Sequence, residues 1–239
     1  MPAHAPDNPV AAQTGNPTVD YTNSGHRLRG VLTPFSVAAR RKFYDRFQSA
    51  IRPAAEDTIL DVGVTPDMST EDSNYFERWY PYTERITATT IEDASGLEKF
   101  FPGLTFVRGD GNRLPFEDKQ FDVAFSSAVL EHAGTSEQQR VFLAEMLRVS
   151  KRFFLTTPNR WFPMELHTFL PFLHWLPQRT HQSILRRLGQ HQWATTETLN
   201  LLDEQSLRAL FPAGVTPVIS SVRSLGFRSH LLAYGESNP

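Results

Sequence analysis

Residues 114–132 read LPFEDKQFDVAFSSAVLEH and contain the strand that decides the fold. Within them, QFDVAFSSAVL is almost wholly apolar in its first half, which is typical of a central parallel strand covered on both faces. Strand-like and helix-like stretches alternate around this segment, which predicts a Rossmann-like, doubly wound α/β fold. The other strand-like stretches before the change of pattern are TILDVGV (58–64), ERITATTIE (84–92), LTFVRGD (104–110) and RFFLTTPN (152–159).

Two further strands are expected near the end of the chain. VTPVISSVRSLGF (215–227) and RSHLLAYGE (228–236) follow one another closely, so they predict an antiparallel pair at one edge of the sheet. With them the mostly parallel sheet has seven strands. Ser136 is expected to cap a helix over 136–150, and Asp203 a helix that follows it. STEDSNYFERWYP (69–81) predicts another helix.

The chain of 239 residues fits one domain. Residues 1–20 are rich in Pro, Ala and Asn and predict a disordered arm, and residues 21–239 the single domain. An amphipathic helix over 34–51 is expected to lie over the ligand edge as a lid, because Phe35, Ala38, Phe43, Phe47 and Ile51 share helical spacing. Residues 160–203, rich in Pro, His and Trp, interrupt the alternation and are expected to form an insertion on the substrate side.

Composition narrows the classes of function. The formal net charge of −2 gives no field that would attract nucleic acid, and the absence of cysteine excludes disulfides and thiolate chemistry. No segment approaches the length of apolar residues that a membrane span needs, and the first residues lack a secretory signal. The expectation is a cytoplasmic protein that acts on a small molecule, with no nucleic-acid partner, no stable membrane insertion and an unpredicted oligomeric state.

Small and acidic residues recur where the strands end. In a doubly wound sheet, ligands bind outside the carboxyl ends of the strands. Carboxylates there can accept the ribose hydroxyls and the adenine amino group, and small residues let the backbone approach, so the pattern suits a nucleoside. The strand-end residues are Asp61, Gly63, Glu92, Asp93, Asp110, Gly111, Asn112, Ser126 and Ser127.

The stretches TILDVGV, GDGNRLPFEDKQFDVAFSSAVLEH and EMLRVSKRFFLTTPN resemble strand regions of class I S-adenosyl-L-methionine-dependent methyltransferases. The likeness covers roughly residues 55–160 and is closest to the small-molecule group that includes the ubiquinone and menaquinone methylases. The resemblance implies S-adenosyl-L-methionine as cofactor and methyl transfer as activity. A catalytically degenerate binding module with the same fold is the alternative, and a nucleotide-dependent oxidoreductase is disfavoured because no G-x-G-x-x-G follows the first strand.

The resemblance also implies roles for the strand-end residues. Asp61 and Gly63 match the first glycine motif, beside the methionine part of the cofactor. Glu92 matches the acid that holds the ribose, although Asp93 and Thr90 remain alternatives. Asp110 matches the acid at the adenine amino group. The residues implied to lie against the adenine ring, or between cofactor and substrate, are Gly111, Asn112, Ser126 and Ser127.

The first motif departs from the family pattern D-x-G-x-G-x-G. Here Gly63 is followed by Val64, Thr65 and Pro66, so two of the three glycines are missing. Val64 and Pro66 disfavour positive φ, so this loop cannot follow the family's backbone path. Thr65, together with Asp67 or Ser69, is expected to replace the lost contacts to the methionine end.

Candidate catalytic residues fall in or near the insertion. Glu165 or His167 could remove a proton from a hydroxyl acceptor inside an aromatic-walled pocket, and His132 lies at the same rim. The alternatives are a packed aromatic cap with structural histidines, and contact with a lipid surface or a lipid-linked substrate. Because the H-x₆-H spacing of His167 and His174 matches no common ligand motif, no metal is expected. Sugars, lipid-linked intermediates and secondary metabolites remain open as acceptors, and the nucleophile as oxygen or nitrogen.

Overall fold

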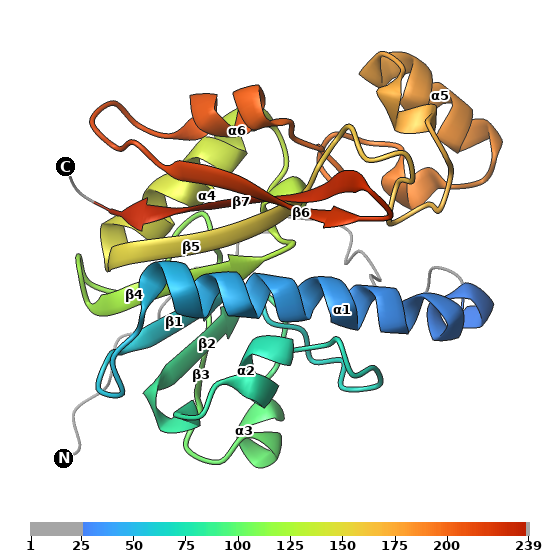
Figure 1. Ribbon diagram of the computed structural model, residues 1–239. Helices are drawn as coiled ribbons and strands as arrows, with labels where there is room; N and C mark the ends of the chain where they lie inside the picture. Colours follow the sequence, from blue (N-terminus) through green and yellow to red (C-terminus); the bar gives the residue numbers. More distant parts are fainter. Residues whose placement is uncertain (1–25, 238–239) are drawn as a thin grey trace, which may run out of the picture.

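The computed structural model describes residues 26–237, and side chains from Thr33 onward. Its centre is a seven-stranded sheet in the order β3-β2-β1-β4-β5-β7-β6, with helices on both faces (Figure 1). The strands are β1 Ile59–Val62, β2 Ile86–Thr90, β3 Thr105–Arg108, β4 Phe121–Ser127, β5 Ser150–Pro158, β6 Val218–Ser224 and β7 Phe227–Glu236. The expected seven-stranded, mostly parallel sheet is therefore confirmed, whereas the expected arm over residues 1–20 lies outside the described residues.

The first five strands of the sheet run parallel, and β7 is antiparallel to both β5 and β6. The β4 strand is the central strand that its apolar sequence predicted, because it pairs with β1 on one side and β5 on the other. The carboxyl ends of β1, β2, β3, β4 and β5 consequently meet at one edge of the sheet. The α-helices are α1 His26–Ile51, α2 Tyr75–Trp79, α3 Leu97–Phe100, α4 Ser136–Val149, α5 Gln178–Arg187 and α6 Glu204–Leu210.

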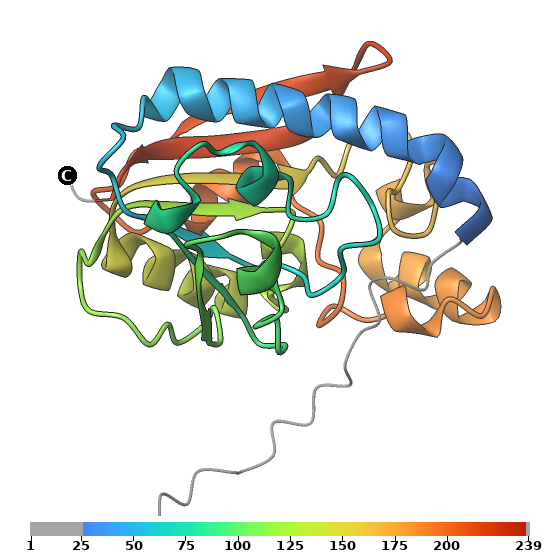
Figure 2. The same cartoon turned by 90° about the horizontal axis from the view of Figure 1, so that it is seen from below.

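The long helix α1 covers one face of the sheet and extends toward the insertion (Figure 2). Phe47 is fully buried in an aromatic cluster, with ring centroids 5.1 Å from Phe76 and 5.5 Å from both Phe125 and Phe154. The predicted lid thus begins earlier than residue 34 and packs on the sheet. Two residues of the expected apolar stripe, Phe35 and Ala38, are exposed, and Ala39 and Tyr44 are buried in their place because the packing face is rotated toward them.

Helices α4 and α6 cover the opposite face. Thr135, not Ser136, is the N-cap of α4: its side chain accepts from the backbone N–H of Gln138, whose side chain in turn accepts from the N–H of Thr135. The expected cap was wrong by one residue because both neighbours are hydroxyl residues, and only this capping box distinguishes them. Asp203 caps α6 as predicted, accepting from the N–H of Ser206 at 2.8 Å.

The insertion that follows β5 has a small core of its own. Leu185 on α5, Trp193, Ala194 and Leu199 are buried together. Two short 3-10 helices, η3 Leu173–Trp175 and η4 His191–Trp193, complete it. The insertion lies beyond the end of the sheet and beside the start of α1, so it can wall a site at the strand ends (Figures 1 and 2). No helix within residues 26–237 is both long and apolar enough to cross a membrane.

A buried histidine at the start of β7 predicts acid sensitivity. Burial, with the charges of Arg40 and His167, lowers the pKa of His230 to about 3. Its unfolded-state pKa is about 6.5, so between these values the unfolded chain binds more protons and the free energy of unfolding falls as the pH falls. We expect His230→Gln to reduce that slope by up to about 1.4 kcal/mol per pH unit.

Urea unfolding at several pH values between neutral and acid would measure the effect. His191→Gln is the matched control, because His191 is exposed. A slope unchanged by His230→Gln would contradict the prediction.

Candidate active site

A pair of buried carboxyl groups lies where β1 ends. Asp61 is 6% exposed and Glu77 of α2 is 1% exposed. Burial raises the pKa of Asp61 well above its usual range, and the adjacent Glu77 raises it further. Burial also raises the pKa of Glu77, and neither of its carboxylate oxygens has a hydrogen-bond partner among the described residues. Burial therefore favours the neutral form of both acids, and the nearby Glu77 favours it further at Asp61.

The loop after β1 is held by side chains rather than glycines. Asn74 accepts from the backbone N–H of Thr65 and donates to the carbonyl of Thr65. The Thr65 hydroxyl accepts from the N–H of Asp67, whose carboxylate accepts from Ser69. The expected helix over 69–81 is reduced to α2, because Asn74 has φ +47° and interrupts any helix before it.

Gly63 is required by packing. Its φ is +102°, and a Cβ there would lie 2.2 Å from Cγ2 of Val129. Its N–H donates to the carbonyl of Thr89, so β1 and β2 stay paired as far as this turn. The turn is thus fixed at the edge where the strands end, although two family glycines are absent.

Two acids, Glu92 and Asp93, follow β2, and only Asp93 accepts a hydrogen bond within its own loop. Asp93 caps the turn before α3, and the hydrogen bonds from Ser95 lower its pKa. Glu92 is half-buried and makes no hydrogen bond that involves its side chain with the described residues. The strand itself stops at Thr90. Glu92 remains the predicted ribose ligand, since the carboxylate of Asp93 is already engaged.

The turn after β3 presents an amide and a carboxylate. Asp110 is exposed, and its Oδ1 accepts from the N–H and side-chain amide of Asn112. Oδ1 of Asn112 is buried without a partner among the described residues. Gly111 touches α4 so closely that a Cβ would lie 2.4 Å from the ring of Phe142. The glycine is required for this packing, and the two polar side chains keep acceptor capacity for a ligand.

The two serines at the end of β4 have different surroundings. Ser126 is buried and donates to the carbonyl of Val62 at 2.8 Å, so its hydroxyl ties β4 to β1. Ser127 is half-buried and accepts from the hydroxyl of Tyr75 at 3.0 Å. Thr156 on β5 lies 3.0 Å from the same Ser127 oxygen. Ser127 is therefore the serine that meets the ligand edge, joined there by a tyrosine from α2.

Beyond β5, the predicted acid and histidine form a hydrogen-bonded pair. Nδ1 of His167 lies 2.7 Å from Oε1 of Glu165. Burial by itself would raise the pKa of Glu165, but His167 and the N–H groups of His167 and Thr168 lower it to about 2. Burial would lower the pKa of His167, and the Glu165 carboxylate raises it. Glu165 thus fixes the orientation of the ring and favours its protonated form.

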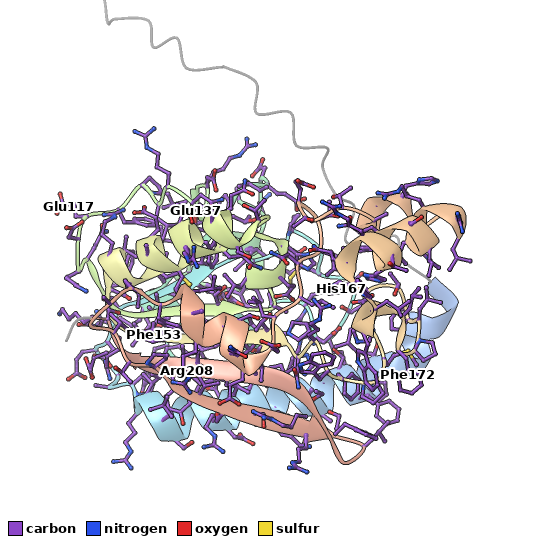
Figure 3. The ribbon with its side chains drawn as sticks, turned by 90° about the horizontal axis from the view of Figure 1, so that it is seen from above. Glu117, Glu137, Phe153, His167, Phe172 and Arg208 are labelled. Carbon is purple, nitrogen blue, oxygen red and sulfur yellow. The ribbon has the colours of Figure 1, made fainter. Side chains whose placement is uncertain are left out.

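His132 comes to the same place from the end of β4. It lies in the short helix η2 Leu130–His132, and its ring is 4.7 Å from that of His167. Nδ1 of His132 lies 2.8 Å from the carbonyl oxygen of Thr198. Burial and the charge of His167 lower the pKa of His132 to about 3, so it is uncharged. Figure 3 shows His167 where the insertion meets the sheet.

All three predicted catalytic residues are therefore brought together, although they come from two different connections of the sheet. Glu131 joins them: it is fully buried, and burial raises its pKa to about 7. Glu131, His132 and His167 can each offer a ligand atom within 4.8 Å of the others. The sequence predicted no metal, because the spacing of His167 and His174 matches no common ligand motif. His174 is not part of this group: its Nε2 lies 2.8 Å from the carbonyl oxygen of Phe162.

A surface hollow of about 440 Å³ lies elsewhere, between the end of β5, the start of α6 and the start of β7. Asn159, Trp161 and Arg228 are among the residues that line it. None of the predicted site residues does. Its position therefore adds nothing to the assignment of the strand-end edge.

A model of the family described as methyltransferase domain matches residues 61–152. This range begins at Asp61 and includes the ends of β1, β2, β3 and β4. The chain carries a class I S-adenosyl-L-methionine-dependent methyltransferase domain. The match ends at Arg152, so the insertion with Glu165 and His167 lies outside it.

Solved structures share the methyltransferase fold. The N-methyltransferase NodS from Bradyrhizobium japonicum WM9, in complex with S-adenosyl-L-homocysteine, aligns with TM-score 0.51 and 15% identity over 84% of this chain and 87% of that one. Magnesium protoporphyrin IX methyltransferase from Synechocystis PCC 6803, with the same compound bound, aligns with TM-score 0.51 and 10% identity over 84% and 83%. At these identities the likeness shows the fold.

One curated relative matches part of the methyltransferase sequence. The phthiotriol/phenolphthiotriol dimycocerosates methyltransferase of Mycobacterium tuberculosis is 42% identical over 62 residues, which are 26% of this chain and 20% of the relative. The chain therefore matches only about a fifth of that relative's length.

Three residues that lie beside the predicted site residues were not predicted from the sequence. Glu131 directly precedes His132 in the sequence, and the apolar residues before it could have indicated a buried acid. Glu77 and Asn74 carried no signal, because the loop and α2 that place them depart from the family pattern.

Proposed function

We propose that the protein transfers the methyl group of S-adenosyl-L-methionine to a hydroxyl oxygen of a small or medium-sized acceptor. One observation carries the proposal: the oriented Glu165–His167 pair lies beyond the end of β5, and the ring of His167 is 4.7 Å from that of His132, which follows β4. A nucleoside edge with a proton acceptor near it is what such a transfer needs.

In this proposal, residues at the carboxyl ends of the strands contact the cofactor. Glu92 would accept the ribose hydroxyls, and the free oxygen of Asp110 the adenine amino group. The backbone from Gly63 to Thr65 would meet the methionine end, in a loop that Asn74 already holds in shape. The buried Asp61 and Glu77, whose neutral forms burial favours, would then offer hydrogen-bond donors or acceptors there.

The sulfonium of the cofactor supplies an activated methyl group, so the protein's own part is alignment and proton removal. Nδ1–H of His167 donates to Glu165, which leaves Nε2 to accept the hydroxyl proton as the oxygen attacks the methyl carbon and the carbon–sulfur bond breaks. Glu165 stabilises the imidazolium that results. In this proposal Glu165 is a positioning residue and His167 the proton acceptor.

The surroundings favour an acceptor with an apolar part. The ring of Trp193 lies 4.9 Å from that of His167 and 5.9 Å from that of His132. The relative that matches part of the chain is named for phthiotriol and phenolphthiotriol dimycocerosates. We therefore propose a hydroxyl-bearing lipid or lipid-linked molecule before a free sugar, and no nucleic acid.

Calorimetric titration with S-adenosyl-L-homocysteine tests the cofactor edge. We expect Asp110→Ala to weaken binding at least about tenfold, since a charge-assisted hydrogen bond contributes about 1.5–3 kcal/mol. Glu117→Ala is the control, because Glu117 is exposed and lies at the opposite end of the domain from His167 (Figure 3).

Failure of the unaltered protein to bind at millimolar ligand would overturn the proposal. That result would favour a binding module in which the rebuilt loop between Gly63 and Asn74 has lost the cofactor.

A further inference from the structure

We infer that Glu131, His132 and His167 form a binding site for a divalent transition-metal ion, here called the Glu131–His132–His167 cluster. The ligand atoms of the three side chains lie within 4.8 Å of one another. Two imidazoles and one carboxylate are a ligand set that Zn²⁺, Fe²⁺, Mn²⁺ and Co²⁺ accept. Neither the methyltransferase fold nor methyl transfer itself requires a metal ion.

The hydrogen bonds decide on which nitrogen of each ring the proton lies. A carbonyl oxygen only accepts, so Nδ1 of His132, 2.8 Å from the oxygen of Thr198, carries the proton. An ionised carboxylate only accepts, so Nδ1 of His167 also carries its proton toward Glu165. When each ring is uncharged, its lone pair is therefore on Nε2. Nε2 of His132 lies 3.9 Å from Oε1 of Glu131, inside the cluster.

The partners of both rings are those found around metal-bound histidines. Such histidines usually donate their second N–H to a carboxylate or a backbone carbonyl, which fixes the tautomer and the ring orientation. His167 has the carboxylate of Glu165, and His132 has the carbonyl of Thr198. Both partners belong to the insertion, which therefore holds the two rings in place.

Glu131 supplies an independent observation. Its side chain is fully buried, and Oε2 accepts from the hydroxyl of Thr157 at 3.0 Å. Oε1 is buried without a hydrogen-bond partner among the described residues. An unpartnered carboxylate oxygen is costly in a protein interior unless a positive charge meets it. A cation bound between Oε1 and the two rings would satisfy it.

The cluster can hold a cation once its side chains move closer together. In a tetrahedral site, ligand atoms about 2.0–2.2 Å from the metal lie about 3.3–3.6 Å apart. From separations of up to 4.8 Å, the cluster would therefore close by roughly 1.2–1.5 Å, through rotations of the two rings and of the Glu131 carboxylate. Three protein ligands leave open coordination positions, as in catalytic rather than structural metal sites.

The open positions point to a role, and this role, unlike the site itself, rests on the proposed function. A cation at the cluster would bind the acceptor's hydroxyl oxygen beside the edge that holds the cofactor. It would also take the lone pair of His167, so the coordinated hydroxyl would lose its proton to water instead of to that ring. The substrate class that fits is an alcohol or a vicinal diol, which can occupy one or two coordination positions.

Direct binding of Co²⁺ to the full chain, stripped beforehand with chelator, tests the site without cofactor or acceptor. We expect one equivalent to bind with visible absorption bands typical of nitrogen ligands, and Zn²⁺ to displace it. His132→Ala and His167→Ala should each weaken binding at least about tenfold, and Glu165→Gln by about 10–100-fold through the ring that it orients.

The control is His191→Ala, an exposed histidine of the same insertion. Circular dichroism and a thermal midpoint on each variant would separate lost ligands from lost folding, and Glu165→Gln keeps all three ligands. Binding that no cluster substitution weakens, or no stoichiometric binding by the folded protein, would overturn the inference. Because cofactor binding is measured separately, either result leaves the proposed methyl transfer to be judged on its own test.

Discussion

Gly63→Ala is expected to lower the free energy of unfolding by about 2–5 kcal/mol. The added Cβ would lie 2.2 Å from Cγ2 and 2.8 Å from Cγ1 of Val129, so the turn after β1 or the helix η2 has to shift. The φ of +102° adds strain for any residue with a side chain. Overpacking contributes about 1–3 kcal/mol and the unfavourable φ about 1–2 kcal/mol. Thermal unfolding should show a midpoint lower by roughly 5–15 °C.

Gly96→Ala is the matched control, because no atom lies within 4 Å of the Cβ that it would add. Val129→Ala combined with Gly63→Ala separates the two causes, since it removes both clashing methyl groups and leaves the strain of φ. The double variant should be more stable than additivity predicts. Additive losses would show that the contact with Val129 is not what makes the glycine necessary.

His167→Ala is expected to lower kcat by two to four orders of magnitude, the usual contribution of a general base. Transfer of a labelled methyl group to a panel of hydroxylated lipids and glycolipids provides the assay. We expect the same loss of kcat if Nε2 accepts a proton and if it binds a cation. Affinity for S-adenosyl-L-homocysteine should stay within about twofold, because the ring touches none of the residues that we assign to the cofactor.

His191→Ala should keep full activity, and Glu165→Gln should fall between the two variants. The pH profile adds a readout that a structural role would not change. Glu165 raises the pKa of His167, so its replacement should move the acid limb of the profile to lower pH. Full activity of a folded His167→Ala variant would remove this histidine from the mechanism.

Local patterns were sufficient for most of the sheet. The apolar run from Phe121 to Phe125 could only be a strand covered on both sides, and the close pair at the end of the chain could only return antiparallel. Helix caps and the buried face of α1 were harder to predict. The capping box that makes Thr135 rather than Ser136 the N-cap depends on backbone geometry. The buried face of α1 depends on the aromatic residues against which the helix packs.

The site divides in the same way. Asp110, Glu92 and Ser127 could be proposed because strand ends converge by topology alone. The sequence showed that the loop after β1 departs from the family pattern, but not how the loop is held in shape. Asn74 is hydrogen-bonded to Thr65, nine residues earlier. Glu77 is placed near Asp61 by the five-residue helix α2. Neither arrangement follows a repeat or a spacing that a sequence displays.

The sequence by itself determined a doubly wound α/β fold with polar groups along one edge of its sheet, and its motifs resemble those of class I methyltransferases. Strand periodicity and the order of elements are local and repetitive, so they can be inferred from neighbouring residues. Only the tertiary structure brought Glu131 and His132, at the end of β4, to His167 beyond β5. Their meeting depends on how two separate connections pack on each other, a long-range property that the spacing of histidines along the chain does not contain.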